Sequence, residues 1–309
     1  MGSARTRRRA RGIADDPEIR DGLDEVGRSS SSLLVLSAAL LFSTGGAAIK
    51  ATTLSAWQVA GFRSGIAAAA LLLFLPAWRR GWSARTFLVG AAYAATLILF
   101  VTANKLTTAA NAIFLQSTAP LYVLLLAPRF LREPLRRGDP LLAALLVLGL
   151  VTFFVRVDPP LATAPDPLLG NLVAVTGGIA WALTLLGLRW LARSERAKTE
   201  ESAGAAVIAG NLIAFGVCAP LAFPVSRSVP LDWTVVVYLG LFQIGLAYVA
   251  MTRGLRHTPA FEASLLLLLE PVLNSVWAWL VHAEQPGLAS LLGCTFILIA
   301  SLGAATRTE

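Results

Sequence analysis

Long apolar segments follow one another from Leu33 to the end of the chain. Most of them hold about 18 to 23 residues, the length that a helix needs to cross about 30 Å of hydrocarbon. The pattern therefore predicts an all-α integral membrane protein with ten transmembrane helices. The helices are expected at residues 33–50, 56–76, 86–104, 108–128, 141–156, 169–191, 203–224, 232–252, 259–281 and 287–305.

The first 32 residues have a different composition from the rest of the chain. An arginine-rich stretch comes first, then an acidic stretch, then the serines Ser29 to Ser32. A segment with so few apolar residues cannot bury enough surface to offset the entropy of folding. We therefore expect residues 1–32 to form a disordered tail, and the late start of the first apolar run argues against a cleavable signal peptide.

The composition supports a membrane location. Hydrophobic residues make up 56% of the chain and charged residues 14%, where soluble proteins have roughly 25% charged residues. The net charge of +8 comes from short basic clusters between apolar runs. No basic stripe with interleaved aromatic residues is present, so a nucleic-acid partner is not expected. Cys218 and Cys294 lie in apolar segments without a metal-ligand pattern, so we expect packing cysteines and no cofactor.

The distribution of Lys and Arg predicts the topology. If the N-terminus is cytoplasmic, the inside segments hold 21 basic residues and the outside segments hold four. Cytoplasmic loops of membrane proteins carry the excess of Lys and Arg. We therefore expect a multi-pass protein of the cell membrane with both termini in the cytoplasm.

The chain contains an internal repeat. A shift of 151 residues places Pro120 on Pro271 and Glu133 on Glu284, and the motif that begins at Thr44 recurs at Thr176. Five helices per copy is an odd number, so the second copy must have the opposite orientation in the membrane. The prediction is a first repeat at 33–157, a loop at 158–168 and a second, inverted repeat at 169–306.

Inverted repeats are typical of secondary transporters, in which two similar halves expose a central site to each side in turn. Helices interrupted by proline at corresponding positions of the two halves point to that site. Pro120 and Pro271 are therefore candidate hinge residues. The alternative is that both prolines only kink their helices for packing.

Glu270 is the most informative polar residue, because it lies at the centre of the segment 259–281. A charge at that depth costs about 2.5–3.5 kcal/mol even on the lenient insertion scale. Its spacing from Asn274 and Trp277 places the three side chains on one helix face. Glu270 is therefore either a substrate or proton group in a central cavity, or a neutral acid that bonds two helices together.

Other polar residues within the spans are weaker candidates. The segment 108–128 presents Asn111, Thr118 and Tyr122 on one face, and Trp181 and Gln243 lie within two later spans. Taken singly, each such residue more often bonds neighbouring helices than a ligand. Together they would suit a small polar metabolite as substrate.

Two charged positions receive a structural interpretation at this stage. Arg63, about two turns into its helix, is expected to extend its side chain to the membrane surface rather than to hold an anion. Glu133 and Glu284 lie where helices end, and both are expected to be solvated or to form local salt bridges.

The sequence resembles the EamA family of the drug/metabolite transporter superfamily over about residues 33 to 306. The resemblance implies ten helices and the transport of small metabolites, often amino acids and frequently outward. Gln285 departs from the family's usual Glu-Pro, since the proline falls at Pro286. The residues that carry the resemblance are Ala48 to Lys50, Phe62-Arg63, Lys105 to Ala112, Thr118 to Leu121, Arg132 to Pro134, Trp181-Ala182, Arg189, Ala263 to Leu266, Leu269 to Val272 and Glu284.

Three kinds of function follow from these observations. The favoured one is a secondary active transporter of a small polar metabolite, with an amino acid exporter as the narrower form. A translocator of lipids or hydrophobic drugs on the same fold is the nearest alternative, and a membrane-embedded enzyme is disfavoured because no catalytic cluster is visible. The expected partners are a small-molecule substrate and the lipid bilayer, while proton coupling and a homo-oligomer stay open.

Overall fold

The computed structural model describes residues 32–130, 138–155, 157, 159–194, 199–254, 267 and 269–305. The regular elements in these ranges are helices, apart from one isolated bridge between Leu161 and Ala164. The first helix spans Ser32–Lys50, and α3 (Gly45–Lys50) is its final part. The later elements are α4 (Ala56–Phe74), η1 (Pro76–Arg79), α5 (Ala84–Leu106), α6 (Ala109–Gln116), α7 (Ala119–Phe130), α8 (Asp139–Val155), α9 (Pro167–Ser194), α10 (Thr199–Ala222), α11 (Pro230–Tyr238), η2 (Leu239–Leu246), α12 (Ala247–Gly254), α14 (Leu269–His282) and α15 (Leu288–Ala305).

Several of these helices are long and apolar enough to cross a membrane. In the described residues, seven stretches meet that condition, and two shorter apolar helices cover Pro140–Val155 and Leu288–Ala300. The prediction of a helical membrane protein is therefore confirmed for this part of the chain. Each predicted segment contains a helix, although 259–281 is described only at 267 and from 269 onward. The expected tail lies outside the described residues, except for Ser32. The seven stretches are Ser32–Lys50, Ala56–Phe74, Ala84–Leu106, Ala109–Leu126, Pro167–Leu188, Glu201–Ala222 and Pro230–Met251.

Polar side chains set the helix starts. Ser55 and Gln58 form a reciprocal capping box at the start of α4, and Ser83 and Thr86 form another at the start of α5. Asp166 accepts a hydrogen bond from the backbone of Leu169, directly before the proline that opens α9. These bonds satisfy backbone N–H groups that a helix leaves free at its first turn.

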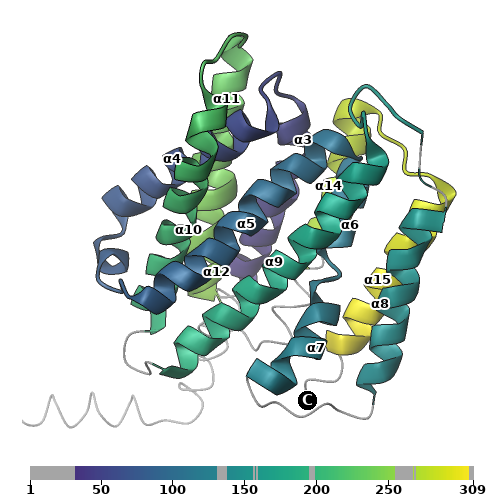
Figure 1. The fold of residues 1–309 in the computed structure, drawn as a ribbon, viewed down its shortest axis with the longest axis horizontal. Helices are drawn as coiled ribbons and strands as arrows, with labels where there is room; N and C mark the ends of the chain where they lie inside the picture. The colour runs from purple at the N-terminus through teal and green to yellow at the C-terminus, as the bar shows by residue number, and fades with distance from the viewer. Residues whose placement is uncertain are drawn as a thin grey trace, which may run out of the picture.

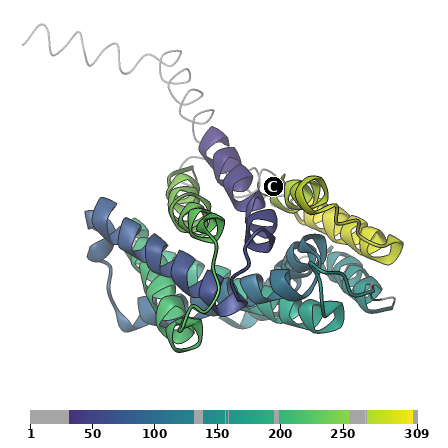
Figure 2. The ribbon, with the colours of Figure 1, turned by 90° about the horizontal axis from the view of Figure 1, so that it is seen from above.

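The helices pack in two groups on opposite sides of the molecule. α5 packs along α9 and α10, α10 also packs along α4, and α8 pairs with α15 at the opposite side of the molecule (Figure 1). The first helix lies between the green and yellow segments of the second half of the chain (Figure 2). Its last part, α3, contacts α14, α6 and η2. The first helix therefore joins elements from both halves of the sequence.

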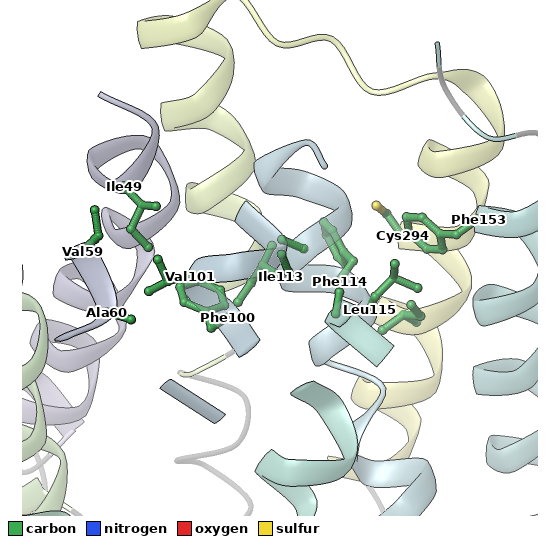
Figure 3. Packing of buried hydrophobic residues seen from close by; sticks show 14 of the residues in the cluster. Ile49, Val59, Ala60, Phe100, Val101, Ile113, Phe114, Leu115, Phe153 and Cys294 are labelled. Atoms are coloured by element: carbon green, nitrogen blue, oxygen red, sulfur yellow. The ribbon is translucent and has the colours of Figure 1, made fainter. Parts of the chain in front are cut away.

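An apolar cluster fills the space between these groups (Figure 3). Ile49 from the first helix contributes to it together with Val101 of α5 and Leu115 of α6. The cluster extends to Phe153 of α8 and Cys294 of α15, which links the peripheral pair of helices to the rest. Cys218 and Cys294 are both buried free thiols, consistent with the packing role predicted for them.

Close contact between α5 and α10 depends on two glycines. A Cβ atom on Gly210 would lie 2.8 Å from the carbonyl oxygen of Gly90 and 2.5 Å from the ring of Tyr93. Lipid tails are as apolar as the helices, so association within a membrane depends on such close packing more than on the hydrophobic effect.

We predict that Gly210→Ala lowers the thermal stability of the detergent-purified protein, while Gly216→Ala leaves it unchanged or raises it. Both changes gain up to about 1 kcal/mol of helix propensity. A Cβ on Gly216 meets nothing within 4 Å, whereas one on Gly210 meets backbone. Overpacking costs about 1–3 kcal/mol. Equal melting temperatures for the two variants would show that the contact between α5 and α10 does not need a glycine.

Candidate functional site

A buried ion pair joins the two halves of the chain. Lys50 ends the first helix, and its Nζ lies 2.9 Å from Oε1 of Glu284, which follows α14. The two side chains are 1% and 2% exposed. The ammonium also donates to the backbone oxygens of Thr107, at 2.7 Å, and Thr163, at 2.5 Å. The buried ammonium is thus compensated by one ion pair and two hydrogen bonds to backbone oxygens, as a charge removed from water requires.

Glu284 also caps a helix. Its Oε2 accepts a hydrogen bond of 2.9 Å from the backbone N–H of Ala109, the first residue of α6. A carboxylate is stabilised at a helix N-terminus by the free N–H groups and the helix dipole. The expectation that Glu284 is solvated or pairs locally is therefore wrong, because Glu284 connects the ends of three helices that lie far apart in sequence. Glu133 lies outside the described residues.

Further polar bonds surround this end of the molecule. Asp232, which is fully buried, accepts bonds from the backbone N–H and the hydroxyl of Thr53 at 2.7 and 2.6 Å, and from the backbone of Val229 at 2.8 Å. Lys105 donates to the backbone and hydroxyl oxygens of Thr52. The loop after the first helix is thus fixed to the start of α11 and to the end of α5.

Asn274 lies against the first helix. It is fully buried, and neither its Nδ2 nor its Oδ1 has a hydrogen-bond partner among the described residues. A Cβ on Gly46 would lie 2.2 Å from this Oδ1 and 3.0 Å from Oδ1 of Asn104, an oxygen that is also unpartnered. Leaving a buried amide unpaired costs about 1–3 kcal/mol. Gly46 thus brings two amides from α5 and α14 to one point on the first helix.

Trp277 also contacts the first helix. Its indole Nε1 donates a hydrogen bond of 3.0 Å to the hydroxyl of Ser43, and one ring nitrogen of His282 lies 2.8 Å from the carbonyl oxygen of Ala47. The structure therefore places Asn274 and Trp277 together along the seam between α14 and the first helix. Ser43 and Asn104 were not singled out from the sequence, where an isolated serine or asparagine carries little signal.

Arg63 belongs to a second group of buried polar contacts, separate from the Lys50–Glu284 ion pair. It is the eighth residue of α4 and is only 1% exposed, so the expectation that it reaches the membrane surface is wrong. Its Nη1 donates to Oε1 of Gln243 at 3.2 Å, and its Nη2 donates to the carbonyl oxygen of Leu97 at 3.0 Å. Its Nε has no hydrogen-bond partner in the part of the chain that the structure describes. Arg63 does not reach the membrane surface because α5 and η2 pack over its guanidinium.

Gln243, one of the predicted site residues, belongs to a stretch of π-helix. Leu239–Leu246 has π-helical hydrogen bonding between two α-helical segments. A Cβ on Gly240 would lie 2.8 Å from the carbonyl oxygen of Arg63, so the stretch packs directly on the α4 backbone. Such π segments occur frequently at functional sites. Here the segment places the Gln243 amide on the guanidinium.

Glu270 lies in the first turn of α14 and is half-buried. Within the described part of the chain its carboxylate makes no hydrogen bond or ion pair. The ring of Tyr248 packs edge-on against Tyr93 with a centroid distance of 5.2 Å. Tyr93 of α5 and Tyr248 of α12 therefore form an aromatic contact between two helices.

The candidate residues in the fourth predicted segment, 108–128, are separated by a break in the helix. α6 ends at Gln116 and α7 begins at Ala119, directly before Pro120. Asn111, on α6, donates to Oδ1 of Asn171 at 3.3 Å, which favours a bond between helices. Thr118 lies in the break and faces Gly178 of α9, with its hydroxyl bonded to the Leu115 carbonyl oxygen.

Tyr122 and Trp181 are the remaining candidates. Tyr122 is half-buried on α7 and packs against the apolar cluster of Figure 3. Trp181 is half-buried on α9 and makes no polar contact within the described residues. The predicted residues thus fall into separate contact groups, with Asn274 and Trp277 on the first helix, Gln243 on Arg63, and Asn111 on Asn171. A single lining that contains all of them stays a prediction.

The fold is that of a multi-pass membrane protein with buried polar groups between its helices. A family model of the EamA-like transporter family matches residues 29–155 and 168–306. The chain therefore belongs to the EamA-like transporter family, and the predicted family resemblance is confirmed. The two matched stretches correspond to two repeats of the family domain.

Comparison with other proteins supports the fold. A crystal structure described only as that of a protein superposes with a TM-score of 0.59 and covers 91% of this chain and 99% of the other. The sequence identity of 22% limits that likeness to the fold. No protein with a curated function matches the sequence closely enough to count as a relative.

Proposed function

We propose that this protein is a secondary active transporter of a small polar metabolite, an amino acid or a related compound, which it exports by alternating access. Family membership supports the transport of a small molecule. Asn274 carries the proposal further, because a fully buried amide with two unpartnered atoms is costly unless a ligand uses it. Ten spans in two inverted repeats, with both termini in the cytoplasm, form the proposed architecture.

The Lys50–Glu284 ion pair is proposed as a gate for alternating access. It connects the first helix, α6 and α14 at one end of the molecule, the end predicted to be extracellular. Opening this end would require the two charges to separate or to move together. Separation of the pair would leave a buried charge without its partner, which is costly, so the intact pair favours the closed state of this end.

Pro120 and Pro271 are proposed as the hinges of this movement. The fourth span is interrupted at Ser117 and Thr118, one helical turn or less before Pro120. Pro271 lies in the first turn of α14, and residues 259–266 and 268 of its predicted segment lie outside the described residues. Interrupted helices in corresponding positions are the usual sign of a transport site.

We predict that proton coupling passes through Glu270. The carboxylate has no cation or hydrogen-bond donor among the described residues, so its protonation would change the charge of the site without breaking a fixed ion pair. In proteoliposomes, transport by Glu270→Gln is expected to lose its dependence on pH, because Gln does not titrate. Glu201→Gln, in a different helix, is the control. An unchanged pH profile in Glu270→Gln would contradict proton coupling at this residue.

One observation favours the translocation of a lipid or hydrophobic drug instead. An apolar groove of about 420 Å³ lies between α4, α10 and α11, and its lining would suit an acyl chain. Phe62, Gly65, Ile66, Ala69, Leu72, Leu212, Phe215 and Trp233 line it. The groove contains none of the candidate polar residues, so it does not explain Asn274 or Gln243.

Thermal unfolding of the detergent-purified protein across a metabolite panel distinguishes the two functions. A ligand that binds the folded state raises the apparent melting temperature. We expect one class of small polar solute to raise it, and Asn274→Ala to abolish that effect without loss of the fold. Stabilisation by lipids or hydrophobic cations, with silence from polar solutes, would favour the alternative.

A further inference from the structure

The apolar groove between α4, α10 and α11 lies on the side of the molecule that faces lipid. Each of these helices belongs to a stretch that is long and apolar enough to cross a membrane. α4 and α10 lie together at one edge of the molecule (Figures 1 and 2). The groove is open, since Leu212 and Trp233 in its lining are each 40% exposed. The core of a bilayer contains no water, so hydrocarbon must fill the groove.

One face of α4 forms a wall of the groove with a hollow in it. Gly65 and Ala69, four residues apart, are small, and the larger side chains of Phe62, Ile66 and Leu72 lie on the same face. A Cβ on Gly65 would lie 2.9 Å from the ring of Phe215, so α10 forms the opposite wall at close range. The hollow is therefore a consequence of the small residues at these two positions.

The length of the groove matches one acyl chain. Phe62 and Leu72 are ten residues apart, which corresponds to about 15 Å along a helix. This is about half of the 30 Å hydrocarbon thickness of a bilayer, or the depth of one leaflet. At its Phe62 end the ring of Phe62 packs against Trp233 of α11 with a centroid distance of 5.3 Å. The groove therefore ends in aromatic rings about one leaflet away from Leu72.

An arginine lies at the other end of the groove. The guanidinium of Arg79 donates to the carbonyl oxygens of Leu72 and, at 3.3 Å, Leu73. Arg79 and the next residue, Arg80, are exposed, and neither forms an ion pair with a carboxylate in the described residues. A guanidinium has five N–H donors and binds phosphate through two of them. This end of α4 is predicted to be cytoplasmic, and anionic lipids concentrate in the cytoplasmic leaflet.

We propose that the groove holds a resident anionic phospholipid of the cytoplasmic leaflet, with one acyl chain between α4 and α10 and the phosphate on Arg79. The lipid stays with the protein and is not transported, so this inference goes beyond the proposed function. An apolar lining of one-leaflet length with a positive charge at one end fits an anionic phospholipid. A polar solute has no use for the lining, and an uncharged hydrophobic drug has none for Arg79.

The first test compares two phospholipids on the unaltered protein. The detergent-purified protein is stripped of lipid and titrated with phosphatidylglycerol or phosphatidylcholine that carry the same acyl chains. A bound lipid raises the melting temperature. We expect phosphatidylglycerol to bind about tenfold or more tightly, because two arginines attract its net negative charge. Equal affinity for the two lipids would overturn the proposal.

Two substitutions then locate the site. Arg79→Gln should remove most of the preference for phosphatidylglycerol, whereas Arg227→Gln, the same change at an exposed arginine in the loop before α11, should keep it. Ala69→Phe fills the groove and should weaken the binding of both lipids at least about tenfold. Ala91→Phe is its control, because Ala91 is an exposed alanine of α5 that does not line the groove.

Three outcomes would contradict a resident lipid. Unchanged lipid affinity in Ala69→Phe would show that the lipid binds elsewhere. A dimer that Ala69→Phe dissociates would assign the groove to a second copy of the chain. Movement of labelled lipid between leaflets that Ala69→Phe abolishes would make the groove a transport path. If Arg79→Gln does not fold, the comparison of Ala69→Phe with Ala91→Phe decides. Solute transport is measured separately, and its failure would leave this inference intact.

Discussion

Lys50→Met is expected to destabilise the protein by about 3–5 kcal/mol, because it leaves the Glu284 carboxylate buried without its cation. The partner is 2% exposed and cannot turn to water without moving α14. The backbone oxygens of Thr107 and Thr163 lose their shared donor in the same step. The effect should appear as a large fall in melting temperature in detergent.

A double-mutant cycle isolates the ion pair. Glu284→Gln alone should also destabilise the protein, because it leaves Lys50 charged among neutral acceptors. The double variant Lys50→Met with Glu284→Gln has no unpaired charge, so its loss should be smaller than the sum of the two single losses. Additive losses would show that the two residues act independently and would remove the basis for their role in closing this end of the molecule.

Asp232→Ala is expected to have the second largest effect, a loss of about 3 kcal/mol or more. Three N–H or O–H groups of Thr53 and Val229 donate to this fully buried carboxylate. Hydrogen bonds to a charged group contribute about 1.5–3 kcal/mol each, and rehydration of the freed donors offsets part of that sum. The loop after the first helix would no longer be fixed to α11, which chemical or thermal unfolding would measure.

Asp166→Ala is the matched control for this prediction. Asp166 also starts a helix, but it is exposed and its side chain accepts one bond, from Leu169 at 3.1 Å. Its removal should cost about 1 kcal/mol, the usual value for a helix cap. Similar losses in the two variants would mean that the contact of Asp232 with Thr53 adds nothing beyond local capping.

The helices could be predicted from the sequence because each apolar segment has the length that the membrane requires. The same argument explains why Asn274, Trp277 and Gln243 were selected as candidate site residues, since each lies well inside a predicted span, whereas Asn104 lies at the end of one. The break at Ser117 and Thr118 was signalled only by Pro120. The π-helical stretch had no signal, because it depends on the packing of Gly240 against the carbonyl oxygen of Arg63.

The charged residues were interpreted wrongly for a physical reason. Arg63 is buried because α5 and η2, which lie far from it in sequence, pack over its side chain. The sequence shows only that the side chain is long enough to reach the membrane surface. Glu284 did carry a signal, because it recurs as Glu133 in the repeat. A repeated acid at a helix end suggests a specific partner, but only the fold shows that this partner is Lys50.

The most direct test of transport is solute counterflow in proteoliposomes. Vesicles that contain the purified protein are loaded with an unlabelled amino acid or another small polar metabolite that stabilises the protein, and uptake of a trace of the same solute in labelled form is followed. The account predicts transient accumulation above equilibrium, absent from protein-free vesicles and strongly reduced in Asn274→Ala. Vesicles that accumulate no solute of any class, while the protein moves labelled lipids between leaflets, would contradict it.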